Sequence, residues 1–233
     1  MKYIIGMTTI NRNPSDNYLE KTIDSFDRAG GLSYPNSKLV ISDSGSKDLS
    51  FILPIEDKYN GKLDILYSDH KLTSHQNVSK VLKHCANISS KYVIYIQDDI
   101  VFRPDIMSHI NSFVEDYPDS PMWCFYTPYQ EVLTRANKGI KKWDYKPANY
   151  YGSLCYCLRK EHAMEYAQEL ISTPSGGGDI VLNRWLQNKF PNKFIAASCP
   201  CFVQHIGKHS IIHGKNMTFR RNQSFDKFFG KGA

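Results

Sequence analysis

Two adjacent carboxylates, Asp98 and Asp99, follow residues 91–96, which have the strongest strand pattern of the chain. Carboxylates this close disfavour joint ionisation unless they face a cation. A divalent cation such as Mn²⁺ or Mg²⁺ removes that cost, because it takes carboxylate oxygens and keeps positions for phosphate oxygens. The pair is therefore compatible with a metal site. Taken alone, it slightly favours the alternative, that both aspartates cap the turn before a helix that starts at Pro104.

A third carboxylate, Asp179, follows the glycines 176–178 and precedes the apolar residues Ile180 and Leu182 at helical spacing. An aspartate in the first turn of a helix is usually a cap. Beside a glycine loop through which a substrate can approach, it can also accept a proton as a general base. The residues alone leave both interpretations open.

His205 ends a short apolar segment and is followed by Lys208 and His209. A lone histidine at a strand end is more often structural than functional. Here the cluster can serve a metal ion and a diphosphate together, since imidazole ligates divalent metals and lysine pairs with phosphate. The residues alone leave open whether His205 or His209 is the metal ligand, and Lys208 between them is expected to contact the phosphates with the remaining histidine.

The net charge of +6 comes from the C-terminal fifth of the chain, which carries eight basic residues and one acidic residue from position 189 onward. A local field of that sign favours a nucleotide diphosphate, a polyanionic acceptor or both. Residues 217–231 also interleave aromatic rings with cations. That pattern fits either a lid that folds over a bound ligand or an arm that grips nucleic acid.

Strand and helix patterns alternate through the first half of the chain, so we predict an α/β fold with an open, mostly parallel central sheet. In such sheets ligands bind outside the carboxyl ends of the strands. Strands are expected at 2–7, 38–42, 63–67 and 91–96, with helices capped by Ser15 or Asp16, opened by Ser74 and started by Pro104.

The second half is less regular. Strands are expected at 122–126, 154–158, 194–198 and 202–205, helices at 161–171 and 179–188, and a long functional loop at 127–152. We expect a single Rossmann-like domain over 1–233, with a nucleotide-binding half at 1–100, an acceptor half at 101–210 and a basic, aromatic tail at 211–233.

Composition sets the class and compartment that we expect. Hydrophobic residues make up 41% and charged residues 22%, and the chain contains neither a signal-peptide pattern nor an apolar run long enough to span a membrane. We therefore expect a cytoplasmic protein without a membrane span. The six cysteines include two C-x-C pairs in apolar segments, which favours buried free thiols over a zinc site.

Five segments, taken in order, resemble the GT-A glycosyltransferases. They are Met-Thr-Thr-Ile-Asn-Arg at 7–12, Asp-Ser-Gly-Ser at 43–46, Tyr-Ile-Gln-Asp-Asp-Ile at 95–100, Gly-Gly-Asp-Ile-Val-Leu at 177–182 and the segment 202–210. The last looks like the C-terminal segment of the type IV branching N-acetylglucosaminyltransferases and related bacterial and phage enzymes. The resemblance implies a GT-A fold and a nucleotide-sugar donor, with a UDP-sugar expected.

The resemblance also implies roles for particular residues. Asp99 would coordinate Mn²⁺ or Mg²⁺ and His205 would complete its shell, while Asp179 would be the base of an inverting transfer. Gln97 replaces the first aspartate of the D-x-D form, so one carboxylate would do most of the ligation. Together with Lys208 and His209, the expected donor-binding residues are Thr8, Asn11, Arg12, Asp43, Gln76, Asn77 and Asp98.

Three functions remain open at this point. The first is inverting transfer of a sugar to a hydroxyl of an acceptor glycan. The second uses the same chemistry on a hydroxymethylated base in DNA, as phage DNA glycosyltransferases do, and the basic tail favours it. The third is a sugar-nucleotide-binding module without catalysis, which the presence of Asp99, Asp179 and His205 disfavours.

Overall fold

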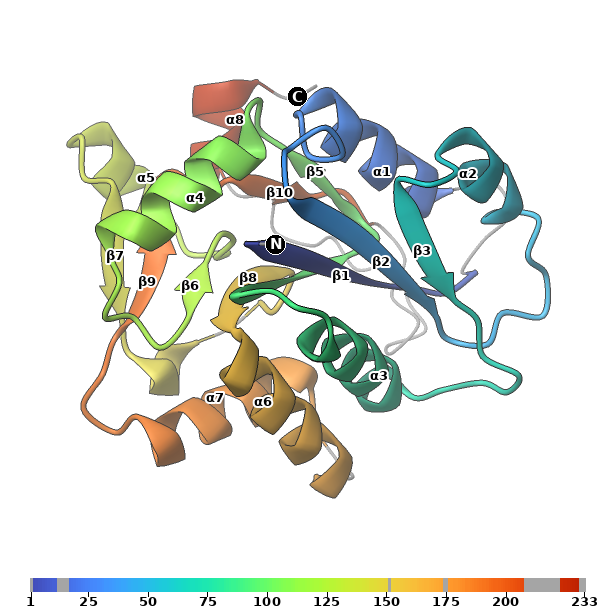
Figure 1. Cartoon of the computed structure of the whole chain (residues 1–233). Helices are drawn as coiled ribbons and strands as arrows, with labels where there is room; N and C mark the ends of the chain where they lie inside the picture. Colours follow the sequence, from blue (N-terminus) through green and yellow to red (C-terminus); the bar gives the residue numbers. More distant parts are fainter. Residues whose placement is uncertain (1, 12–16, 151, 174–175, 208–222, 231–233) are drawn as a thin grey trace.

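The computed structural model of the protein describes residues 2–11, 17–150, 152–173, 176–207 and 223–230. Within these residues, eight strands form one central sheet and two further strands form a separate ribbon (Figure 1). In hydrogen-bonding order, the central strands are β3 (Leu63–Leu66), β2 (Ser37–Asp43), β1 (Tyr3–Thr9), β4 (Tyr92–Gln97), β8 (Cys155–Arg159), β6 (Trp123–Cys124), β9 (Ile195–Ser198) and β7 (Lys142–Tyr145).

The first half of the sheet is parallel, as predicted. β1 pairs in parallel with β2 and with β4, and β2 pairs in parallel with β3. The four strands expected in this half are confirmed, with ends that differ by one or two residues. Because these strands are parallel, their carboxyl ends meet at one edge, which brings together the loops that carry the candidate residues.

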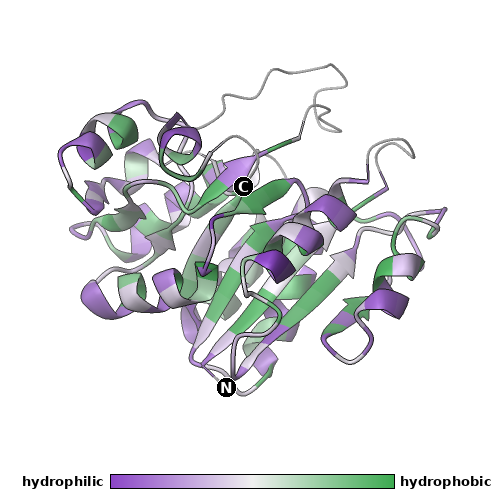
Figure 2. Ribbon diagram, turned by 90° about the horizontal axis from the view of Figure 1, so that it is seen from above, coloured by the Kyte–Doolittle hydropathy of each residue, from purple (hydrophilic) through white to green (hydrophobic). Residues whose placement is uncertain are grey.

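Helices cover both faces of the sheet (Figure 1). Alternate residues of β1 enter two separate apolar clusters, with Tyr3, Ile5 and Met7 in one and Ile4 in the other. Figure 2 shows apolar residues concentrated on the strands and polar residues on the outer helix surfaces. The first cluster includes α1 (Tyr18–Arg28), α2 (Leu53–Lys58) and α4 (Ile106–Asp116), and the second includes α3 (Ser74–Asn87), α6 (Lys160–Ser172) and α7 (Gly178–Lys189).

The second half of the sheet is mixed. β8 is antiparallel to both β4 and β6, β9 is parallel to β6, and β7 is antiparallel to β9. The strand expected at 122–126 is reduced to Trp123–Cys124, whereas the strands and helices expected at 154–158, 161–171, 179–188 and 194–198 are present.

The ribbon pairs β5 (Ile100–Phe102) with β10 (Val203–His205) in antiparallel register. Strand β5 was missed by the sequence patterns, and the prediction that a helix starts at Pro104 was wrong. Helix α4 begins at Ile106, after Asp105 in the left-handed conformation at a φ of 54°. Strand β5 separates Asp98 and Asp99 from α4, so neither aspartate caps that helix.

The prediction of a long loop at 127–152 was wrong as well. The segment contains α5 (Glu131–Asn137), β7 and the short 3₁₀ helix η1 (Pro147–Asn149). Its tyrosines and tryptophan pack on one another: the Trp143 and Tyr145 ring centroids lie 4.6 Å apart, and Tyr145 is 2% exposed. The aromatic residues of this segment therefore build the edge of the sheet.

Helix α1 is capped by Asn17, so the prediction of Ser15 or Asp16 as its cap was wrong. The Asn17 side chain accepts a hydrogen bond of 3.2 Å from the backbone amide of Glu20. Helix α3 begins at Ser74 and buries the apolar face predicted for it.

All six cysteines are buried free thiols, as predicted. Burial raises the pKa of the Cys85 and Cys124 thiols to about 12, so both stay protonated and unreactive. Within the described residues, no helix is both long and apolar enough to cross a membrane.

Part of the basic tail is a helix, α8 (Gln223–Phe229). Its Phe225 is 1% exposed, its Ser224 hydroxyl accepts from the Cys201 amide at 3.2 Å, and Asp226 accepts from the Gln204 side chain at 3.1 Å. This end of the tail is therefore packed beside β10.

Candidate active site

The turn after β4 holds Asp98 in a fixed place. Asp98 is 2% exposed, and its Oδ2 accepts a hydrogen bond of 2.7 Å from the Thr9 hydroxyl at the end of β1. The Thr22 hydroxyl of α1 donates to the Asp98 carbonyl at 2.7 Å and accepts from the Ile100 amide at 3.1 Å. Strand β1 and helix α1 together thus determine the path of this turn.

The ribbon brings Asp99 and His205 together although 106 residues separate them in sequence. Nε2 of His205 lies 3.2 Å from Oδ2 of Asp99, and both residues are 5% exposed. The backbone amide of Ile206 also donates to the Asp99 carbonyl at 2.9 Å. The two residues predicted to hold a metal ion are therefore neighbours, as such a site requires.

Gly207 keeps open the space that these two side chains face. A Cβ atom at this position would lie 2.5 Å from Oδ2 of Asp99 and 2.9 Å from Nε2 of His205. Any other residue would press its Cβ against both the carboxylate and the imidazole.

A carboxylate oxygen and an imidazole nitrogen beside such an opening form a donor set that suits a divalent cation. Among the described residues, no group of three acidic, histidine or cysteine side chains is arranged so that it could hold a metal ion by itself.

The end of β2 carries Asp43, which is 1% exposed. Its Oδ2 accepts from the amides of Gly45 at 2.9 Å and Ser46 at 2.7 Å, and its Oδ1 accepts from the Ser46 hydroxyl at 2.6 Å. The Asn11 amide in turn donates to the Ser46 hydroxyl at 2.9 Å. Asp43 therefore shapes the loop after β2 and links it to the loop after β1.

The other predicted donor residues that the structure describes form hydrogen bonds with the protein itself. The Thr8 hydroxyl is 2.8 Å from the Tyr95 hydroxyl, and Asn77, 1% exposed, bonds to both the backbone and the hydroxyl of Ser42. The Gln76 side chain accepts from the Thr73 amide and completes the capping box of α3. The predicted residues Arg12, Lys208 and His209 lie outside the described residues.

A cleft of about 450 Å³ opens beside Thr9, Asn11 and Asp98, between α1 and α2. Most of its walls were missed by the sequence analysis, because the six-residue helix α2 has too few residues to show a helical period. The further residues that line it are Ile10, Asn17, Tyr18, Leu19, Glu20, Asp24, Ser50, Phe51, Pro54, Ile55, Lys58 and Tyr59.

The charged side chains of this cleft are mostly acidic. Oδ1 of Asp24 accepts hydrogen bonds of 2.8 Å from both the Lys58 ammonium and the Tyr59 hydroxyl. The hydrogen bond from Lys58 lowers the pKa of Asp24, and the same bond raises the pKa of Lys58 to about 12. Both groups are thus charged at neutral pH, and the carboxyl groups of Glu20 and Asp98 also line the cleft.

Asp179 lies in the first turn of α7, on the other face of the sheet. Its Oδ1 accepts from the backbone amide of Ile180 at 3.0 Å, and the N-cap residue Gly177 has no side chain to cap the helix. A Cβ atom on Gly177 would lie 2.6 Å from Oδ1 of Asp179, so this glycine makes room for the carboxylate.

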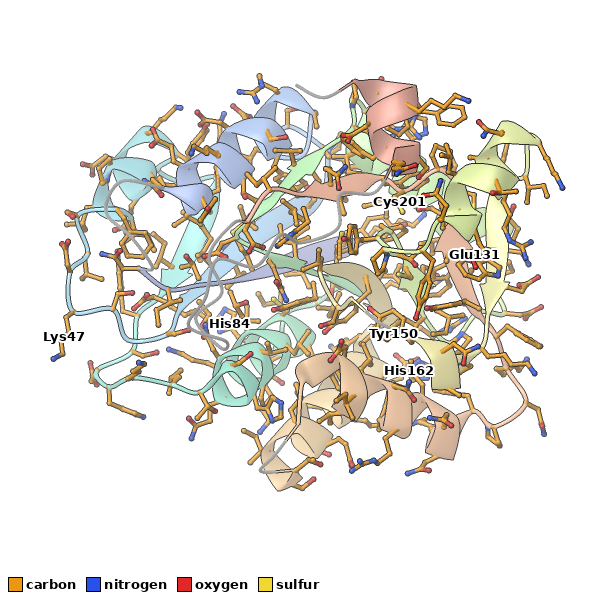
Figure 3. The ribbon with its side chains drawn as sticks, turned by 180° about the vertical axis from the view of Figure 1, so that it is seen from behind. Lys47, His84, Glu131, Tyr150, His162 and Cys201 are labelled. Carbon is orange, nitrogen blue, oxygen red and sulfur yellow. The ribbon has the colours of Figure 1, made fainter. Side chains whose placement is uncertain are left out.

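Tyrosines surround the start of α7. The Tyr166 hydroxyl donates to the Gly178 carbonyl at 2.9 Å, and Figure 3 shows Tyr150 on the sheet side of α6 and α7. Burial raises the pKa of Tyr150 and Tyr166 well above 10, and the negative charge of Asp179 adds to both shifts. Both hydroxyls therefore remain protonated donors at any physiological pH.

No family model and no curated protein sequence matches the chain. Solved structures do match its fold. One is S. aureus TarS 1–349 in complex with UDP, at a TM-score of 0.59 and 13% identity over 85% of this chain and 58% of that one. Another is GalNAc-T7 with UDP, GalNAc and Mn²⁺, at a TM-score of 0.62 and 12% identity over 88% of this chain and 43% of that one.

A third is the mannosyltransferase PcManGT from Pyrobaculum calidifontis with GDP-Man and Mn²⁺, at a TM-score of 0.57 and 14% identity. It matches over 85% of this chain and 56% of its own, so the chain spans about half the length of these three structures. All three are nucleotide-sugar glycosyltransferases, and the chain has the GT-A fold that they share.

Proposed function

We propose that the protein transfers a sugar, with inversion, from a nucleotide diphosphate sugar to an acceptor hydroxyl, and that it needs a divalent cation. The observation that carries this proposal is the buried pair Asp99 and His205, 3.2 Å apart, with Gly207 leaving the adjoining space open. The UDP and Mn²⁺ in similar structures make a UDP-sugar and Mn²⁺ or Mg²⁺ the first candidates.

Asp99 and His205 are the residues that would hold the cation. When bound there, Mn²⁺ or Mg²⁺ would neutralise the negative charge of the departing diphosphate. Lys208 and His209 belong to this half of the proposal as phosphate contacts, because the positive charge of the chain is concentrated in its C-terminal fifth. Arg12 is included as a donor-binding residue that the family resemblance implies.

The cleft between α1 and α2 is the proposed place of the nucleoside. Its volume of about 450 Å³ is within the usual range for a small-molecule pocket, and it combines the rings of Tyr18 and Phe51 with amide and carboxylate groups. Its acidic excess disfavours phosphate, so the diphosphate would extend outward to Asp99 and His205. Thr8, Asp43, Gln76 and Asn77 would then act on the donor mainly by fixing the loops around it, while Asn11 and Asp98 reach the cleft itself.

Asp179 is the proposed general base. It would accept the proton of the acceptor hydroxyl while that oxygen forms a bond to the anomeric carbon. The bond from the anomeric carbon to the diphosphate breaks in the same step, and its electron pair leaves with the diphosphate. Attack from the face opposite the leaving group inverts the anomeric configuration, and no second carboxylate is needed.

The proposed acceptor is a sugar hydroxyl, in line with the resemblance of residues 202–210 to branching N-acetylglucosaminyltransferases. The alternative acceptor, a hydroxymethylated DNA base, is favoured by the charge of the tail alone. A gel-shift titration with duplex DNA over a salt series separates the two, because phosphate contacts make binding fall steeply with ionic strength.

The test of the proposed function measures UDP binding by calorimetry, with and without Mn²⁺, and hydrolysis of UDP-sugars. We expect Asp99→Asn to weaken Mn²⁺-dependent UDP binding roughly 100-fold, since it removes a charged ligand. Asp179→Asn should leave UDP binding intact and slow turnover by roughly 100-fold or more.

Asp64→Asn is the control, because Asp64 is a partly exposed carboxylate that pairs with Lys38 at 2.6 Å on β2 and β3. Wild-type behaviour of both test variants would refute the proposal. Nucleotide binding without any turnover in the wild-type protein would instead support a non-catalytic binding module.

A further inference from the structure

Three buried tyrosines from different elements form a continuous row between the end of β1 and the start of α7. They are Tyr95 of β4, Tyr156 of β8 and Tyr166 of α6, each at most 2% exposed. Tyr95 and Tyr156 are register partners whose rings stack with centroids 5.0 Å apart, and the Tyr156 and Tyr166 centroids are 6.4 Å apart at 71°. The row crosses from the parallel half of the sheet to the helices on its α3 and α6 face.

The hydroxyls of this row reach both ends of the proposed site. At one end the Tyr95 hydroxyl lies 2.8 Å from the Thr8 hydroxyl. At the other end the Tyr156 ring packs edge-on against the ring of Tyr166, whose hydroxyl donates to the Gly178 carbonyl at 2.9 Å. A phenylalanine would fill the same volume, so the contribution specific to tyrosine at these positions is the hydroxyl.

The turn that receives this hydrogen bond has few side chains of its own to hold it. It is entered through Gly176, Gly177 and Gly178, and no side chain caps α7. A hydrogen bond from the core to Gly178 therefore restrains the residue directly before Asp179. Burial of Tyr166 makes this bond strong, because its hydroxyl would lose its partner without gaining water.

We propose that Tyr166 is a positioning residue for Asp179, and that Tyr156 and Tyr95 extend its support to Thr8 at the end of β1. This inference rests on the proposed function of Asp179 as the base. Small displacements of a base from its proton donor slow catalysis strongly, so loss of one hydroxyl in the core would reduce turnover without touching a substrate.

The first experiment measures amide hydrogen exchange in residues 178–181 of Tyr166→Phe and needs no substrate. We expect exchange there to be at least threefold faster than in wild type. The matched control is Tyr3→Phe, which removes another buried tyrosine hydroxyl, bonded to Asn111 at 3.2 Å at the opposite end of β1. Unchanged exchange at 178–181 in Tyr166→Phe would overturn the inference whatever Asp179 does.

The second experiment is a double-mutant cycle with Asp179→Asn, read by hydrolysis of the UDP-sugar that the wild-type protein hydrolyses fastest with Mn²⁺. We expect Tyr166→Phe to lower kcat about tenfold with KM for the donor unchanged, and to have no further effect in the Asp179→Asn background.

The outcomes of the cycle separate the two proposals. An equal effect of Tyr166→Phe in both backgrounds would show that it does not act through Asp179, and the inference would fall while the proposed base stands. Wild-type hydrolysis by Asp179→Asn would instead remove the base from the proposed function, while faster exchange in Tyr166→Phe would still show that the hydroxyl anchors α7.

Discussion

The donor side of the proposed site carries Asp98 and Asp99, and the start of α7 carries Asp179. The structure holds these carboxylates in different ways. Asp98 and Asp99 follow a central strand, are 2% and 5% exposed, and bond to Thr9 and His205, which lie 89 and 106 residues away in sequence. Asp179 is only partly buried at the start of a helix, and its Oδ1 bonds to the amide of the next residue.

This difference matches what each group is proposed to do. A cation and a diphosphate need charges fixed in advance, and strand ends joined by long-range hydrogen bonds provide that rigidity. A base must meet an acceptor that arrives from solvent, and a helix start after three glycines can adjust to it. The row of tyrosines that ends at Gly178 would limit how far that adjustment goes.

The largest expected effect compares two glycines that each leave room for a carboxylate. Gly207→Ala places a Cβ 2.5 Å from Oδ2 of Asp99, which the ribbon prevents from moving away. We expect Mn²⁺-dependent UDP binding to weaken at least as much as for loss of a metal ligand, by roughly 100-fold. Calorimetry with Mn²⁺ and UDP measures this.

Gly177→Ala is the matched change beside Asp179, at the start of α7. Its Cβ would lie 2.6 Å from Oδ1 of Asp179, but this carboxylate is partly exposed and can rotate. We expect UDP binding to stay at the wild-type level and turnover to fall by less than about tenfold. Equal loss of UDP binding in both variants would contradict the contrast between a rigid donor side and an adjustable base.

A smaller effect is expected from two threonines that contact Asp98. One should change the affinity for UDP, and the other should change the free energy of unfolding. Thr9→Val removes the hydroxyl that donates to Oδ2 of Asp98, which lines the cleft. Loss of one hydrogen bond to a charged group costs about 1.5–3 kcal/mol, so UDP affinity should fall about tenfold or more.

Thr22→Val is its control, since that hydroxyl bonds only to backbone atoms, the Asp98 carbonyl and the Ile100 amide, among the contacts that the structure describes. We expect it to lower the free energy of unfolding by about 1 kcal/mol or more while UDP affinity changes little. A thermal melt in parallel with calorimetry gives both quantities. If Thr22→Val weakened UDP binding as much as Thr9→Val, the cleft would not be the nucleoside site.

The sequence predicted the parts of the fold that depend on local patterns. The uninterrupted apolar segment at 91–96 predicted the central strand β4, and the spacing of Val78, Val81 and Leu82 predicted α3. It also predicted that Asp99 and His205 would serve one site, but only through a family resemblance. Their proximity follows from the pairing of β5 with β10, and the three-residue strand β5 is too short to show an alternating pattern.

The errors have a similar cause. Pro104 suggested a helix start because proline is common there, yet Asp105 in the left-handed conformation delays α4 by two residues. The lysines, tyrosines and prolines of 127–152 suggested a loop, whereas the edge-on packing of Trp143 and Tyr145 against Tyr129 decides the structure of this segment. The cleft between α1 and α2 could not be predicted, because its walls come from segments that meet only in the folded chain.

The smallest expected effect tests the same contrast through pH. His162 lies between the rings of Trp185 and Phe190 under α7, and burial lowers its pKa below 6.5. Its contribution to stability is therefore complete above the unfolded value of about 6.5 and is lost as pH falls through that value toward the lower folded pKa. We expect a small fall in Tm from pH 7 to pH 5.5, and this fall should be smaller in His162→Phe.

His109 provides the counterpart on the donor side. Its ring lies 5.9 Å from that of Phe202, the residue before β10, and burial followed by the charge of Arg103 lowers its pKa as well. As with His162, the contribution of His109 to stability is lost as the pH falls. His109→Phe should therefore also reduce the fall in Tm between pH 7 and 5.5. Hydrogen exchange at pH 5.5 then locates each effect: protonation of His162 should loosen α7, and protonation of His109 should loosen the ribbon. Faster exchange of both regions in wild type, with neither change reversed by its own variant, would show that the two halves of the site unfold as one unit.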